Sequence, residues 1–259
     1  MTHSRGPVVV GGGPLIPVNG YLSHMMDIPP SRMFMIKKGL AVYEEAHPGS
    51  PLYDASQGDG GASLPGVPQE ILEQATEFQI EHGTGSDSPY GADAFRRSVV
   101  EDYWQLDSDT GLGPQNVVAA VGGRDALVKA YWAMMNVGMG RIGDVVAVSR
   151  VPWISYNWGP YGVGANVVLM PGEPSDGWAY TPDGIREAVA FPRQHGREVG
   201  ALVIPNPDNP PGHTITPERQ AELAHAALEA GRPYVLFDRM YHQVTGEGAM
   251  DLHPFVPRV

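Results

Sequence analysis

The stretch ALVIPNPDNPPGHTITPERQAELAHAALEAGRPYVLFD, residues 201–238, contains a complete strand–helix–strand unit. Its first apolar run ends in a loop rich in proline and glycine, which is typical of a short buried strand. The helix that follows opens with Thr216 and Pro217. The helix predicted near residues 181–191 opens in the same way with Thr181 and Pro182, a capping threonine followed by a proline at the first helical position. A second apolar run, YVLFD, closes the unit. Two short apolar strands joined through a helix predict parallel pairing in one sheet.

The same alternation extends upstream of this unit. Further strands are predicted in NVVAAVGG (116–123), DVVAVSRVP (144–152) and ANVVLMPG (165–172), and further helices near residues 31–47, 68–82, 92–105, 124–136 and 181–191. The pattern predicts an α/β fold with a mostly parallel sheet and helices on both faces. We expect an N-terminal segment with a substrate-side loop over residues 1–66 and a large domain over residues 67–259.

The composition argues against several classes of protein. Apolar residues make up 42% of the 259 residues, so the chain can bury a core. The formal net charge of −12 argues against nucleic acid and anionic membranes as partners. Cysteine is absent and the histidines lack metal-ligand spacing, so no metal is expected. The N-terminus does not resemble a signal peptide, and no apolar run is long enough to span a membrane, so a cytoplasmic protein is expected.

Ligands of open α/β sheets bind at the carboxyl ends of the strands, so the residues directly after each strand are candidates. Gly122 and Gly123 lie between a predicted strand and a helix, where backbone N–H groups can bind a phosphate. A plain tight turn is the alternative there. Trp153 and Tyr156 follow the next strand, and such aromatic side chains either stack on a flat heterocycle or pack in the core.

Two further strand ends carry polar side chains. Asn209 lies in PNPDNPPG, where the prolines predict a rigid loop that fixes the side-chain amide; an ordinary turn is the alternative. Asp238 ends the apolar strand YVLFD, where a carboxylate needs a cation or a strong donor. A protonated pyridine nitrogen is such a partner, and a helix cap or a salt bridge with Arg239 is the alternative.

These motifs, taken together and in this order, resemble the class I/II aminotransferase family of fold-type I pyridoxal-phosphate (PLP) enzymes. The resemblance runs from about residue 52 to residue 241. LYDASQGDG is similar to a substrate-side segment of that family and implies that Gly58 binds substrate. SPYGADAFRRSVVEDY is similar to its tyrosine–glycine loop and implies that Tyr90 reaches the cofactor phosphate of a neighbouring subunit. GGRDAL is similar to the phosphate-binding turn, which implies cofactor-binding roles for Gly122, Gly123 and Arg124.

The remaining motifs imply how the cofactor ring is held. VPWISY resembles the segment with the stacking aromatic residue, here Trp153. PNPDNPPG is similar to the Asn-Pro-x-Asn-Pro-Thr-Gly motif, which implies that Asn209 hydrogen-bonds the phenolic oxygen of PLP. FDRMY is similar to Asp-x-x-Tyr, so Asp238 is implied to pair with the pyridine nitrogen and Tyr241 with the phenolic oxygen. Asp238 and Tyr241 are therefore the catalytic candidates.

The chain departs from this family in lacking the Schiff-base lysine, which follows the Asp-x-x-Tyr motif by a few dozen residues. None of its lysines matches that position: Lys37, Lys38 and Lys129. We expect a split aminotransferase-like enzyme acting on an amino acid or amine, in which a second polypeptide supplies the lysine and the small domain. Two such heterodimers are expected to pair into a heterotetramer. The alternatives are a non-catalytic PLP-binding or structural subunit, a truncated aminotransferase, and a PLP enzyme that catalyses elimination, decarboxylation or C–C bond formation.

Overall fold

The computed structural model describes residues 6–17, 32–53, 66–106, 108–137, 140–231 and 233–241. The chain forms two compact units, the first made of Met1–Ile28 with Asp93–Val259 and the second of Pro29–Ala92. Helices α2 (Arg32–Ala46) and α3 (Gln69–His82) belong to the second unit, and both were predicted from the sequence. The sequence-based boundary near residue 66 stays a prediction.

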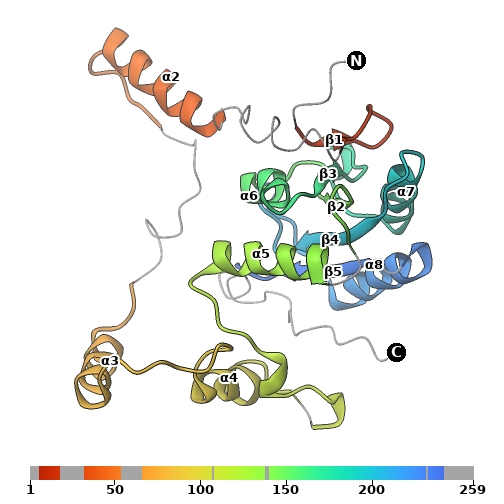
Figure 1. Cartoon of the computed structure of the whole chain (residues 1–259). Coiled ribbons are helices and arrows are strands. Elements are labelled where there is room, and N and C mark those ends of the chain that lie inside the picture. The colour runs from red at the N-terminus through yellow and green to blue at the C-terminus, as the bar shows by residue number, and fades with distance from the viewer. Residues whose placement is uncertain are drawn as a thin grey trace. The chain divides into compact units, whose positions relative to one another are not determined.

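The first unit is built on a five-stranded sheet in the order β1-β3-β2-β4-β5, in which every pairing is parallel (Figure 1). Its strands are β1 (Val8–Val9), β2 (Val145–Val148), β3 (Asn166–Leu169), β4 (Val199–Pro205) and β5 (Tyr234–Asp238). The predicted α/β fold with a mostly parallel sheet is therefore confirmed. The two-residue strand β1 is an addition that the sequence pattern did not indicate.

Helices follow the strands as the sequence pattern predicts. The first unit contains α4 (Asp93–Ser98), α5 (Gly123–Trp132), α6 (Ile154–Trp158), α7 (Pro182–Arg193) and α8 (Pro217–Ala230), and α4 and α5 continue as π-helical turns over Val99–Tyr103 and Ala133–Val137. Both predicted threonine caps are formed. Thr181 Oγ1 accepts a hydrogen bond from the Gly184 N–H at 3.0 Å, and Thr216 Oγ1 accepts one from Arg219 at 3.2 Å. None of the described helices is long and apolar enough to cross a membrane.

The sheet is covered on both faces by apolar side chains. Along β2, Val145 and Ala147 pack into one cluster with residues of α7 and α8, whereas Val146 and Val148 pack into another with residues of α5 and α6. Figure 1 shows α7 and α8 next to each other on one side of the sheet. This alternation follows from the two-residue period of a strand, and it explains why β2 and β4 read as continuous apolar runs.

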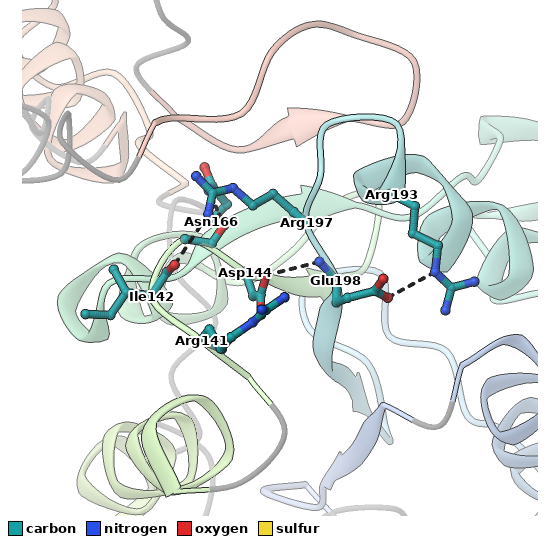
Figure 2. Close-up of polar contacts among 8 residues, drawn as sticks. Arg141, Ile142, Asp144, Asn166, Arg193, Arg197 and Glu198 are labelled. Carbon is teal, nitrogen blue, oxygen red and sulfur yellow. Dashed lines mark hydrogen bonds and ion pairs between the residues drawn. The ribbon is translucent and has the colours of Figure 1, made fainter.

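Hydrogen bonds from polar side chains join the amino ends of the central strands (Figure 2). The buried Asp144 carboxylate accepts hydrogen bonds from the N–H groups of Glu198 (3.1 Å) and Arg141 (2.9 Å), and thus ties the start of β2 to the start of β4. Asn166 at the start of β3 donates to the Gly143 carbonyl at 2.8 Å. These polar groups at the amino edge bond to one another and to the backbone. Most of the site residues predicted from the sequence lie at the opposite, carboxyl edge.

The predicted strand in NVVAAVGG is wrong. Residues 117–121 lie outside the sheet, and Val118 and Val121 are 59% and 91% exposed. Val117 has the extended backbone of a strand (φ −107°, ψ 131°), but a strand also needs a neighbour to satisfy its backbone groups. Within the described residues this segment has none, and the Val121 N–H donates to the Asp125 side chain instead, at 2.8 Å.

Candidate functional site

A pocket of about 240 Å³ opens at the carboxyl ends of β2, β4 and β5. Segments far apart in the sequence contribute to its lining, which consists of Gly123, Arg124, Leu127, Trp153, Tyr156, Asn209, Asp238, Met240 and Tyr241. The structure therefore brings together nearly all the candidates that the sequence placed after successive strands. Gly122 directly precedes the lining as the N-cap of α5.

The start of α5 forms one wall of the pocket. Gly122 has φ 84° and ψ 168°, a backbone conformation that is essentially restricted to glycine. This turn directs the chain into α5, whose first N–H groups have no partner within the helix. The N-terminus of a helix attracts anions through these N–H groups and its dipole. The wall is therefore suited to a phosphate.

An aromatic wall stands beside the start of α5. The Trp153 ring contacts Tyr156 edge to face, with ring centroids 5.5 Å apart and an interplanar angle of 74°. The Arg124 guanidinium lies over the Trp153 ring, 5.5 Å from its centroid. Arg124 therefore places a positive charge and Trp153 a broad flat surface at the pocket.

The Asp238 carboxylate is held by two donors. Its Oδ2 accepts a hydrogen bond from the Tyr156 hydroxyl at 2.7 Å, and its Oδ1 accepts one from the Met240 N–H at 3.0 Å. Arg239 instead donates to Gln220 at 3.0 Å, so the salt bridge between Asp238 and Arg239 is not formed. Burial, reinforced by the Asp238 charge, raises the pKa of Tyr156 well above its usual value. Tyr156 therefore remains a protonated donor to the carboxylate.

The loop after β4 presents Asn209 to the same pocket. The Asn209 side-chain amide donates to the Tyr241 hydroxyl at 2.9 Å, so two of the candidates contact each other directly. Backbone hydrogen bonds close this loop, from the Asp208 N–H to the His213 carbonyl (2.7 Å) and from the Gly212 N–H to the Asp208 carbonyl (2.9 Å). The Asn209 amide and the Tyr241 hydroxyl thus hold each other in place, and each can still donate a hydrogen bond to a ligand.

Two residues that the sequence predicted for the site are not in the described pocket lining. Gly58 lies outside the described residues. Tyr90 belongs to the second unit, in the turn before α4, and is 58% exposed. The hydrogen bond from Tyr156 to Asp238 was not foreseen, because the sequence suggested only stacking or core packing for this aromatic side chain. No local pattern signals this contact, because the two residues are 82 positions apart in the chain.

Comparisons with known proteins place the chain in one family. The family described as "Aminotransferase class I and II" matches residues 55–258. A probable aspartate/prephenate aminotransferase of Thermus aquaticus is 28% identical over 183 residues, which cover 71% of this chain and 44% of that protein. The aspartate/prephenate aminotransferase of Thermus thermophilus is 27% identical over 182 residues, with coverages of 70% and 44%.

The fold is also that of solved aminotransferases. The aspartate aminotransferase from Thermus thermophilus with maleate has a TM-score of 0.69 at 24% identity, over 88% of this chain and 55% of that one. This chain spans 44% of the length of the curated relatives named above. Since the family match covers residues 55–258, most of the sequence, the chain belongs to the class I and II aminotransferase family.

Proposed function

We propose that this chain forms the cofactor-binding part of an enzyme that transfers the amino group of an amino acid or amine. Class I and II aminotransferases depend on pyridoxal 5'-phosphate. The observation that carries the proposal is the convergence of the α5 start, Trp153, Asn209 and Asp238 in one pocket. PLP, when bound, supplies the electron sink for bond breaking at the substrate carbon that bears the amino group.

The chemistry of the pocket fits both ends of this cofactor. Gly122 and Gly123 would present the open N–H groups of α5 to the phosphate, and Arg124 adds a positive charge. At the other end, the Asp238 carboxylate is oriented by its two donors and can accept a hydrogen bond from a protonated pyridine nitrogen. An ion pair with Asp238 would keep the proton on the ring nitrogen.

The flat ring would lie between these two ends. Trp153 offers the stacking surface, and the paired groups of Asn209 and Tyr241 can donate to a phenolic oxygen. These residues would position the ring and maintain its ionisation state. The geometry of the pocket and the family resemblance support these roles.

We propose further that a second polypeptide supplies the lysine that binds the cofactor covalently. No lysine lines the described pocket. The Lys129 ammonium forms an ion pair with Asp125 one turn earlier on α5, at 2.6 Å, and is 57% exposed. Lys37 and Lys38 are exposed residues of α2 in the second unit. A lysine from elsewhere would complete the set of groups needed for covalent chemistry.

Unpaired backbone in the first unit supports such a partner. Among the described strands β5 has β4 as its one neighbour, and its side chains are at least partly exposed, whereas every residue of β4 is buried. The segment 117–121, with its exposed Val118 and Val121, also has no strand beside it in the described part of the chain. Open strand edges favour pairing with another chain. Strands of the partner could pair with the backbone groups of both the β5 edge and the segment 117–121.

We also propose that two complete units pair with each other. The family resemblance implies that Tyr90 serves the cofactor phosphate of a neighbouring subunit. Its 58% exposure leaves much of the ring accessible to such a neighbour. The expected assembly is a heterodimer that pairs into a heterotetramer, and its mass can be checked by light scattering.

Replacing Gly122 with alanine tests the phosphate site. The positive φ at Gly122 makes a side chain there strained although the space around it is open, and such strain costs about 1–3 kcal/mol. Relief of the strain moves the first N–H groups of α5, so we expect affinity for PLP to fall by about tenfold or more. Quenching of tryptophan fluorescence during a PLP titration measures this change.

Gly196→Ala is the matched control for that substitution. Gly196 also has a positive φ (66°) with open space around it, but it lies beside the amino end of β4, away from the pocket. Gly196→Ala is expected to lower the stability of the fold while the affinity for PLP stays unchanged. Equal losses of affinity in both variants would show that the effect is a general loss of stability and would remove the phosphate assignment.

A further inference from the structure

A buried polar cluster lies beneath the loop that presents Asn209. It consists of Asp208, Tyr180 and Ser149, which are 3%, 7% and 1% exposed. Tyr180 interacts with the Asp208 carboxyl and with the Ser149 hydroxyl. Within the described residues, however, neither carboxyl oxygen of Asp208 has a hydrogen bond of regular geometry. A buried carboxyl that is held so weakly is costly once it is charged.

Asp208 connects this cluster to the pocket in two ways. It directly precedes Asn209 in the chain, and its own N–H and carbonyl form the two backbone hydrogen bonds that close the loop. Its side chain is buried and interacts with Tyr180, while Asn209 reaches Tyr241 in the pocket. A shift of the Asp208 side chain therefore moves the backbone from which Asn209 extends.

The protonation state of Asp208 decides how well this packing holds. Burial raises the pKa of Asp208 to about 6, and contacts with Tyr180, the Asn209 N–H and His213 offset part of that effect. Tyr180 and His213 are the titratable side chains that interact with it, Ser149 interacts in turn with Tyr180, and no arginine or lysine interacts with Asp208 among the described residues. The neutral form is therefore favoured below about pH 6 and the charged form above it.

We propose that Asp208 is a positioning residue of the cofactor site. Its neutral carboxyl packs against Tyr180 and fixes the loop of Asn209, and its ionisation loosens that loop. Because the folded state holds this proton more tightly than an unfolded chain does, the stabilising effect is present at low pH and is lost as the pH rises toward 6. The consequence for PLP binding rests on the proposed function, whereas the loop itself can be followed without cofactor.

Hydrogen exchange of the cofactor-free full chain between pH 5 and pH 8 tests the proposal. Protection factors, which correct for the intrinsic pH dependence of exchange, are compared in the wild type and in Asp208→Asn for the loop residues that carry a backbone N–H, namely Asn206, residue 208, Asn209, Gly212 and His213. We expect protection in the wild type to fall severalfold, on the order of tenfold, as the carboxyl ionises, and the asparagine variant to show a flat profile. Identical profiles in the two proteins would overturn the proposal.

Tyr180→Phe gives a second, independent measurement. The Tyr180 contact favours the charged form of Asp208. In Tyr180→Phe we therefore expect the pH at which protection falls to be higher than in the wild type. An unchanged midpoint, or a shift to lower pH, would contradict the proposal even if Asp208→Asn failed to fold.

PLP titrations at pH 5.5 and pH 8 separate this inference from the proposed function. The phosphate of PLP also titrates in this range, so only the difference between the wild type and Asp208→Asn reports on Asp208. Between pH 5.5 and pH 8, we expect the PLP affinity of Asp208→Asn to fall less than that of the wild type. Equal losses count against the role of Asp208, whereas a wild type that binds no PLP contradicts the proposed function and leaves the exchange profiles to decide on Asp208.

Discussion

Replacing Asp238 with alanine is expected to lower turnover of the complete enzyme by at least two orders of magnitude, about 3 kcal/mol or more in the activation barrier. Asp238 is the carboxylate at the end of β5 that can keep the pyridine nitrogen protonated, and the electron sink depends on that charge. Steady-state kinetics of the assembled enzyme with an amino-acid donor measure the loss. PLP affinity should fall less than turnover does, because the other pocket residues still bind the cofactor.

Two companion variants distinguish charge from packing at this site. Asp238→Asn keeps the shape and can still accept the Tyr156 hydrogen bond, but it cannot carry the charge, so it should be nearly as slow as the alanine variant. Tyr156→Phe removes one hydrogen bond to the carboxylate and should lower turnover by about tenfold to a hundredfold, since bonds to charged groups contribute about 1.5–3 kcal/mol. Near-normal turnover of Asp238→Asn would show that its charge is not required.

The chain alone is expected to have no measurable transaminase activity, and addition of its partner is expected to restore it. The described pocket contains no amine nucleophile, and the edge of β5 and the segment 117–121 are unpaired within the described residues. The experiment purifies the chain alone and together with the protein of the neighbouring reading frame, and assays both with PLP and an amino-acid donor. Activity should appear only in the mixture, together with a stable complex in size-exclusion chromatography.

Lys129→Ala is the control for this experiment. Its ion pair with Asp125 on α5 keeps it outside the described pocket lining, so the variant should support full activity in the assembly. Substituting the partner's lysine should abolish activity. A chain that transaminates by itself would disprove the split arrangement, as would an assembly that needs Lys129.

The parts of the fold that were predicted correctly have local sequence signals. β2 and β4 are continuous apolar runs because both of their faces are buried, and α7 and α8 begin with threonine caps that form as expected. Residues 117–121 have the same apolar signal as β2. They nevertheless form no strand, because strand pairing depends on a neighbour that the local sequence cannot specify.

The same distinction applies to the site. Trp153, Asn209 and Asp238 could be predicted because each follows a strand, and parallel strands bring their carboxyl ends to one edge of the sheet. The contact between Tyr156 and Asp238 joins residues 82 positions apart, so no local pattern predicts it. Asp208 reads as an ordinary loop residue, and its burial depends on Tyr180 from another segment.

The most direct test of the split enzyme is to find the lysine that holds the cofactor. The assembled protein is loaded with PLP and reduced with borohydride, which makes the bond between cofactor and lysine irreversible, and the modified peptide is identified by mass spectrometry. We predict a single pyridoxyl label on a lysine of the second polypeptide, with Lys37, Lys38 and Lys129 of this chain unmodified. Stoichiometric label on any of these three lysines, or on a lysine in a longer form of this same polypeptide, would contradict the account.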